Sequence, residues 1–164
     1  MTRRDVLMLA SLADAEFAPA VEVAGTRLFL NGTARRLWSV LRIEVYRAAL
    51  YLPGPSPDAA AILASNAPRL LEARYRRAVP LDSVVMAWEA SAGAPLPPTF
   101  RAWLRPIAAG DVERQLFLAD GVVLEGSGRP PTRQPGAEFG CRLLATWIGP
   151  DTDPALRRGL LGLS

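Results

Sequence analysis

Hydrophobic and polar residues alternate along the first third of the chain, and this pattern predicts β-structure. Residues 21–23 and 27–30 alternate on either side of Ala24-Gly25-Thr26, which predicts a β-hairpin. Asn31-Gly32 is a strong turn signal and predicts a second turn. Residues 37–52 are rich in Val, Ile, Leu, Trp and Tyr and predict one or two long strands. On the later part, alternate residues share one face, namely Tyr46, Ala48, Leu50 and Leu52.

A helix is expected after this strand, because Ser56 is a good N-cap and Pro57 suits the first helical position. Residues 69–78 then alternate again. Leu71, Ala73 and Tyr75 point one way and charged residues point the other, which predicts a sheet with one face in water. Residues 80–92 have apolar residues at helical spacing, and a short helix is expected around residues 98–107.

The last third predicts a hairpin followed by two helices. Strands are expected over residues 112–118 and 122–124, on either side of Asp120-Gly121. Residues 126–136 are rich in Gly, Pro and Arg and are expected to be irregular. Helices should cover residues 137–148 and 154–161, the second capped by Asp153. This order of elements indicates an α+β fold with an antiparallel sheet.

The composition excludes several catalytic mechanisms and kinds of binding site. The chain has 164 residues, which suits one domain, and it contains no histidine, no lysine and a single cysteine, Cys141. Ser-His-Asp and Cys-His catalysis are therefore excluded, and neither a metal site nor a cofactor is expected. The net charge is only +3, with arginines scattered among acids, so a nucleic-acid partner is not expected. No apolar run approaches the roughly 20 residues of a membrane-spanning helix.

The N-terminus resembles a twin-arginine export signal. Thr2-Arg3-Arg4-Asp5-Val6-Leu7 precedes an apolar segment that runs to Ala13, and Ala13-Asp14-Ala15 offers small residues for a signal peptidase. Residues 1–15 are interpreted as this signal or as an N-terminal arm, and residues 16–164 as a single domain. The signal would make the protein exported and periplasmic; the arm would leave it cytoplasmic.

Two parts of the chain, taken in order, resemble one known family. Leu28-Phe29-Leu30-Asn31-Gly32-Thr33-Ala34-Arg35-Arg36 is followed by a strand over residues 45–53, and Pro135-Gly136-Ala137-Glu138-Phe139 leads to Leu143-Leu144-Ala145-Thr146-Trp147-Ile148-Gly149. Together they resemble the chalcone isomerase-like family, in particular its short bacterial branch. The resemblance implies an open-faced β-sandwich, in which an antiparallel sheet carries a layer of helices on one face and a ligand cleft lies between them.

The resemblance also implies site residues. Arg36 falls where the plant enzyme has an arginine that holds an anionic oxygen of the ligand, with Arg35 next if the register slips by one. Tyr46 replaces the catalytic threonine, Thr146 matches a hydroxyl that lines the cleft, and Trp147 replaces a neighbouring methionine. The alternative for Arg36 is an exposed loop arginine, and for Tyr46 and Trp147 it is core packing.

Three functions remain open on this basis. The first is binding of a small amphipathic or acidic ligand, such as a fatty acid, by Arg36 with Tyr46, Thr146 and Trp147. The second is an isomerase of the intramolecular lyase type that acts on a chalcone-like conjugated carbonyl compound, with Arg36 and Thr146 catalytic. Residues 88–98 hold no counterpart of the tyrosine and asparagine in the enzyme's cleft, which favours binding over catalysis. The third is an interaction domain whose cleft is filled by side chains. The ligand's identity and the oligomeric state stay open.

Overall fold

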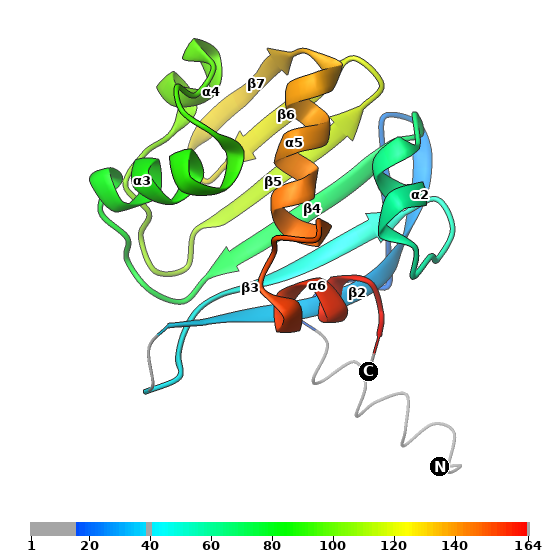
Figure 1. Ribbon diagram of the computed structural model, residues 1–164, viewed down its shortest axis with the longest axis horizontal. Coiled ribbons are helices and arrows are strands. Elements are labelled where there is room, and N and C mark those ends of the chain that lie inside the picture. Colours follow the sequence, from blue (N-terminus) through cyan, green and yellow to red (C-terminus); the bar gives the residue numbers. More distant parts are fainter. Residues whose placement is uncertain (1–15, 39–40, 164) are drawn as a thin grey trace.

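A single seven-stranded sheet organises the molecule. The computed structural model describes residues 16–38 and 41–163. All neighbouring strands are antiparallel and follow one another in chain order (Figure 1). The strands are β1 (Ala20–Val23), β2 (Thr26–Trp38), β3 (Ile43–Leu52), β4 (Arg69–Tyr75), β5 (Val112–Leu118), β6 (Gly121–Gly126) and β7 (Arg129–Pro135).

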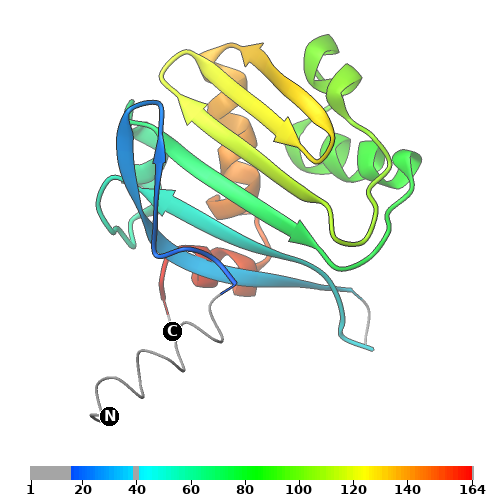
Figure 2. The same ribbon diagram turned by 180° about the vertical axis from the view of Figure 1, so that it is seen from behind.

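The helices form one layer on one face of this sheet, and the view from behind shows the strands uncovered by helices (Figures 1 and 2). They are α2 (Ala59–Ala64), α3 (Leu81–Ala92), α4 (Pro98–Trp103), α5 (Ala137–Ile148) and α6 (Pro154–Leu160). This arrangement confirms the expected α+β fold, an antiparallel sheet with helices on one face. The export signal proposed for residues 1–15 lies outside the described residues.

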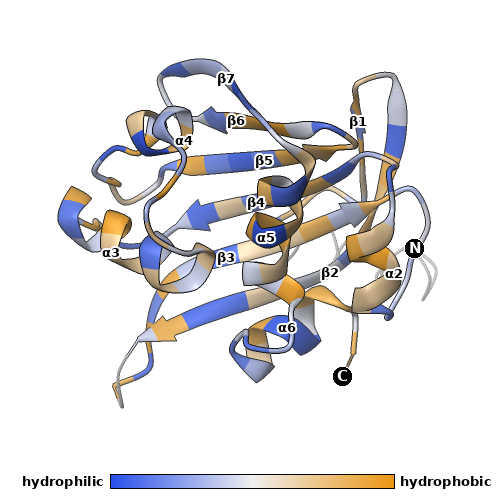
Figure 3. Ribbon diagram, turned by 45° about the horizontal axis from the view of Figure 1, so that its top comes forward, coloured by the Kyte–Doolittle hydropathy of each residue, from blue (hydrophilic) through white to orange (hydrophobic). Residues whose placement is uncertain are grey.

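The main core lies between the helices and the sheet. It joins apolar residues of β3 and β4 with those of α5, and Leu50, Leu71, Leu143 and Leu144 are almost completely buried in it. Hydrophobic and hydrophilic residues succeed one another along the strands (Figure 3), as expected for a sheet with two different faces. A smaller cluster around Phe17, Leu28 and Tyr51 lies on the other face, where β1 and β2 curl over.

The structure differs from several local predictions in where elements begin and end. Helix α2 begins at Ala59 rather than at Pro57, because Asp58 and not Ser56 caps it by accepting a hydrogen bond from the Ala61 amide at 3.2 Å. The stretch over residues 37–52 is divided between β2 and β3. The prediction of an irregular segment over residues 126–136 was wrong. Its prolines lie on β7 at the edge of the sheet, where a missing N–H costs no ladder bond.

The turn predicted at Asn31-Gly32 was also wrong, because both residues lie inside β2. The register between β2 and β3 shifts between Leu30 and Gly32, so Asn31 is the extra residue of a bulge. Its side-chain amide donates to the carbonyls of Ser56 and Leu160, both at 2.9 Å, and its oxygen accepts from the Ser56 amide at 2.8 Å. Asn31 therefore ties the loop before α2 and the end of α6 to the sheet.

Helix α6 approaches β2 unusually closely. A Cβ atom added at Gly32 would lie 2.1 Å from the Gly159 carbonyl oxygen, and one at Gly159 would lie 2.5 Å from the Thr33 carbonyl oxygen. Two glycines therefore let backbone meet backbone, and this contact holds the C-terminal end of α6 against β2. Within the part of the chain that the structure describes, no helix is long and apolar enough to cross a membrane.

Candidate functional site

Arg36 and Tyr46 lie directly opposite each other on β2 and β3. Both side chains are on the face that the helices cover, because Tyr46 packs against the main core and Arg36 meets the first turn of α6. Adjacent residues on β2 alternate between faces, so the strand pairing alone sets this placement. The structure thus brings together the two residues that the sequence suggested as an anion-binding pair.

Asp153 is the third member of this group. Its carboxylate lies 3.8 Å from the Arg36 guanidinium, and it also accepts a hydrogen bond from the Leu156 amide at 3.2 Å, which caps α6. The side chains of Arg36 and Asp153 are 48% and 39% exposed. An exposed pair at this distance contributes about 0–1 kcal/mol, so a stronger anion could displace Asp153 from Arg36.

The ring of Tyr46 begins a continuous layer of aromatic side chains. Its centroid lies 5.4 Å from that of Tyr75 and 5.7 Å from that of Trp147, both edge-on. Trp147 contacts Trp88 at 6.0 Å, and Trp88 contacts Phe100 at 5.6 Å. Edge-on contacts at these distances are favourable, so the space between α5 and the sheet is closely packed here.

The Tyr46 hydroxyl is the polar end of this layer. It makes no hydrogen bond to another described residue, and it is not among their fully buried unpaired atoms. Burial raises the pKa of Tyr46 to about 12, while the nearby Arg36 guanidinium lowers the pKa and the Asp153 carboxylate raises it. The phenol therefore keeps its proton at neutral pH and can donate a hydrogen bond to an anion beside Arg36.

Thr146 and Trp147 are neighbours on α5, but their side chains make different contacts. The Thr146 hydroxyl donates to the Leu143 carbonyl at 2.6 Å in its own helix. The Trp147 ring is 4% exposed, and its indole N–H donates to the Gln115 amide oxygen at 3.0 Å. The Trp147 ring packs against the Tyr46 ring, whereas no contact joins Thr146 to Arg36 or Tyr46 in the described structure.

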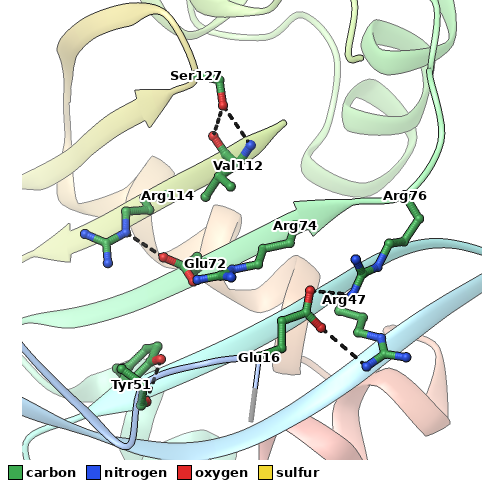
Figure 4. Close-up of polar contacts among 10 residues, drawn as sticks. Glu16, Arg47, Tyr51, Glu72, Arg74, Arg76, Val112, Arg114 and Ser127 are labelled. Atoms are coloured by element: carbon green, nitrogen blue, oxygen red, sulfur yellow. Dashed lines mark hydrogen bonds and ion pairs between the residues drawn. The ribbon is translucent and has the colours of Figure 1, made fainter. Parts of the chain in front are cut away.

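Arg35 lies on the opposite face of the sheet from Arg36. It is directly across from Arg47 on β3, and it lines an open hollow of about 510 Å³ with Glu16, Phe17, Leu30 and Thr33. Arg47 in turn contacts Glu16, which also binds Arg76 (Figure 4). The two neighbouring arginines thus serve different faces, and Arg35 cannot replace Arg36 without a shift in register.

A buried polar group that sequence reasoning missed lies next to the aromatic layer. Glu113 on β5 is 6% exposed and accepts a hydrogen bond from Arg129 at 2.8 Å. The Tyr75 hydroxyl lies beside the same carboxylate. Burial raises the pKa of Glu113, and the contacts with Arg129 and Tyr75 oppose this. Arg129 also donates to the Trp103 carbonyl at 2.6 Å and lies 4.3 Å from the centre of its ring.

These residues limit the chemistry that the site supports. The described residues hold no group of three or more Cys, Asp and Glu side chains that could bind a metal ion. Arg36 and Tyr46 supply a fixed cation and a neutral donor at the margin of an apolar layer. Such a pair can hold a carboxylate or a phenolate by charge-assisted hydrogen bonds.

Comparisons with known proteins agree with the fold. The model of a chalcone isomerase-like family matches residues 9–162. A crystal structure of a fatty-acid binding protein from Arabidopsis thaliana is similar, with a TM-score of 0.65 and 13% sequence identity over 88% of this chain and 90% of that one. No curated protein matches the sequence. At such low identity the structural likeness shows the fold alone, but the family match extends over almost the whole sequence. The chain therefore belongs to the chalcone isomerase-like family.

Proposed function

We propose that the protein binds an amphipathic acid, such as a fatty acid, with the carboxylate between Arg36 and Tyr46. The observation that carries this proposal is the Tyr46 hydroxyl, which has no partner among the described residues although its ring is packed in the core beside Arg36. A carboxylate there would accept from both groups. The fatty-acid binding protein with the same fold supports this class of ligand.

The apolar part of the ligand would lie along the aromatic layer. Tyr46 is only half-buried, so the layer is open at the end next to Arg36. The next ring of the layer, that of Trp147, is almost completely buried. The tail therefore needs side chains of the layer to move aside, and short or medium chains should bind better than long ones.

Native mass spectrometry and calorimetry test this proposal. We expect the purified protein to carry an amphipathic acid, and to bind added dodecanoate but not dodecanol, which lacks the charge. Arg36→Gln should weaken dodecanoate binding about tenfold or more, since hydrogen bonds to charged groups contribute about 1.5–3 kcal/mol.

Arg35→Gln is the matched control, because it removes the same charge from the next residue of β2 but on the other face. It should leave dodecanoate affinity almost unchanged. A clean mass for the purified protein together with no heat of binding for dodecanoate would reject the proposal.

A second candidate function is an interaction domain whose cleft is filled. The continuous contacts among Tyr46, Trp147, Trp88 and Phe100 favour it, because they occupy space that a ligand would need. The same titrations separate the two functions. An interaction domain would bind neither dodecanoate nor a shorter acid, and Arg36→Gln would change nothing in them.

We also propose that the protein is a bacterial, exported one. The support is the order of Thr2-Arg3-Arg4-Asp5-Val6-Leu7, an apolar segment and Ala13-Asp14-Ala15. The intact mass of the protein recovered from the periplasm of a bacterial host should lack residues 1–15. Replacement of both Arg3 and Arg4 by Gln should then retain it in the cytoplasm.

A further inference from the structure

Two large apolar side chains stand exposed at one end of the sheet. Trp38 is 67% exposed and Leu41 is 77% exposed. Trp38 forms the last register pair of β2 and β3, with Ile43. Figures 1 and 2 both show this end of the two strands projecting away from the layer of helices. Single exposed apolar residues are ordinary, but a Trp and a Leu together at one projecting end mark a surface for contact.

Several arginines belong to the same end of the sheet. Arg42 follows Leu41 directly and has a positive φ of 55°, and Arg36 precedes Trp38 by two residues. The Arg76 amide donates to the Val45 carbonyl at 2.8 Å, so the end of β4, with Arg76 and Arg77, lies beside β3.

The carboxylates nearby do not balance this charge. Glu16 is shared by Arg47 and Arg76 (Figure 4), and Glu44 pairs with Arg47. Arg42 and Arg77 form no ion pair with any other residue that the structure describes. This end of the sheet therefore combines two exposed apolar side chains, Trp38 and Leu41, with two arginines outside the described ion pairs, Arg42 in the same hairpin and Arg77 just after the neighbouring strand β4. We refer to Trp38, Leu41, Arg42 and Arg77 as the basic end.

This combination fits a membrane surface better than a protein. A stable protein interface covers about 800 Å² on each partner with a central apolar patch, and two side chains at the end of a ribbon are far smaller than that. Trp prefers the boundary between headgroups and acyl chains, where its ring is partly buried and its N–H stays in contact with water. Arginines near it are attracted by anionic headgroups at the membrane surface.

We propose that the basic end docks on a lipid surface with anionic headgroups, with Trp38 and Leu41 inserted between the headgroups. This inference goes beyond the proposed function and does not depend on it, because none of the residues of the basic end belongs to the Arg36–Tyr46 pair. A lipid surface is nevertheless where amphipathic acids gather, so docking would bring the protein to its ligand.

Sedimentation with lipid vesicles tests the proposal on the purified protein. We expect binding to vesicles of phosphatidylcholine mixed with phosphatidylglycerol, and much weaker binding to phosphatidylcholine alone. Replacing Trp38 by Ala and Leu41 by Ser together should lower binding at least tenfold, because both apolar side chains lose their burial among the lipids. Arg42→Glu should lower it more than fivefold, since it loses one attraction and adds a repulsion.

The other end of β2 offers matched controls. Phe29 is 40% exposed with the Arg27 guanidinium 5.6 Å from its ring centre, so it is also an exposed aromatic beside an arginine. Phe29→Ala and Arg27→Glu should leave vesicle binding unchanged. Equal losses in these controls would mean that binding follows overall charge and hydrophobicity, and would overturn the proposal.

Tryptophan fluorescence locates the contact. Trp103 and Trp147 are 4% exposed and Trp88 is half-buried, so Trp38 is the one of the four that a lipid can easily reach. Brominated lipids in the mixed vesicles should quench its emission. Trp38→Phe should keep most of the binding but lose this quenching.

Three further results would overturn the proposal. They are absence of binding to the mixed vesicles, unchanged binding after the change at Trp38 and Leu41, and a concentration-dependent mass without lipid that this change abolishes. The last result would assign the basic end to self-association instead. Dodecanoate affinity should be unaffected by these substitutions, so failure here is distinguishable from failure of the proposed function.

Discussion

Arg36 on β2 and Tyr46 on β3 are directly opposite each other, on the sheet face that carries the helices. Their meeting depends on the register that follows the bulge at Asn31. A slip by one residue would turn Arg36 to the open face and bring Arg35 to the helices. The position of this pair is therefore a property of the sheet and not of a loop, which makes its geometry well defined before any ligand arrives.

Tyr46→Phe should change the alkaline behaviour of the protein more than its stability at neutral pH. The hydroxyl has no partner to lose among the described residues, so the change at pH 7 should stay within about 1 kcal/mol. The pKa of Tyr46 is raised to about 12, so between pH 10 and 12 the folded state keeps a proton that the unfolded state releases. Stability then falls as pH rises through this window.

Urea unfolding at several pH values between 9 and 12 measures this effect. The free energy of unfolding of the wild type should decrease more steeply over this range than that of Tyr46→Phe. Identical slopes for the two proteins would contradict the raised pKa. Dodecanoate affinity at pH 7 should be lower in Tyr46→Phe than in the wild type, because one donor to the carboxylate is lost.

Two substitutions of Asp153 should separate its two tasks. Asp153→Asn keeps an oxygen that caps α6 but removes the charge next to Arg36. Asp153→Ala removes both, and loss of the cap should cost about 1 kcal/mol of folding free energy. Because the carboxylate competes with a ligand for Arg36, both variants should bind dodecanoate more tightly than the wild type, by a few-fold.

The pKa of Tyr46 should also be lower in Asp153→Asn, since a negative charge that raises it is removed. An absorbance titration of the phenol checks this. Weaker dodecanoate binding in Asp153→Asn would show instead that Asp153 helps to hold Arg36 in place for the ligand.

Gly32→Ala should destabilise the protein severely. Its Cβ would lie 2.1 Å from the Gly159 carbonyl oxygen and 2.8 Å from the Gly162 amide nitrogen, so either β2 or α6 must move. Overpacking of this kind costs about 1–3 kcal/mol or more. Thermal unfolding should show a clear loss of stability.

Gly54→Ala is the control for this substitution, because a Cβ there would meet nothing within 4 Å. It should be neutral or slightly stabilising, since alanine lowers the conformational entropy of the unfolded chain. A similar loss of stability in both variants would contradict the close approach of α6 to β2.

The periodic parts of the fold could be predicted from the sequence because local pattern and tertiary environment agree there. On β4, Leu71, Ala73 and Tyr75 point to the helices while Glu72 and Arg74 point to the open face, as their alternation indicated. Helix α5 and the cap of α6 by Asp153 also followed from local signals. The positions of Arg36 and Tyr46 came from a family resemblance, and the strand register explains them.

Other features could not be predicted because tertiary contacts override the local signal. Asn31-Gly32 has the composition of a turn, but the Asn31 amide bonds to distant backbone groups and Gly32 makes room for α6. On β5, Glu113 and Gln115 face the helices while Leu116 faces the other side. Alternation alone would place Leu116 toward the helices and the two polar residues toward the other face. It fails here because the partners of the polar groups, Arg129 and Trp147, come later in the sequence.

The buried pair of Glu113 and Arg129 should show strong coupling in a double-mutant cycle. Glu113 is only 6% exposed, and Arg129→Met removes the cationic partner of its carboxylate. Removal of one partner from a buried pair lowers the free energy of unfolding by about 3–5 kcal/mol. Glu113→Gln with Arg129→Met removes both charges, so the double variant should be more stable than the sum of the two single changes implies.

The pH dependence supplies an independent check of the same pair. Burial raises the pKa of Glu113 above its ordinary value of 4.5, so the folded state holds a proton that the unfolded state has released, and stability falls as pH rises through that window. Arg129→Met should raise this pKa further and extend the fall to higher pH, whereas Glu113→Gln should remove it. Urea unfolding between pH 4 and 8 measures all three. Additive free energies and parallel pH profiles would mean that Glu113 and Arg129 act independently.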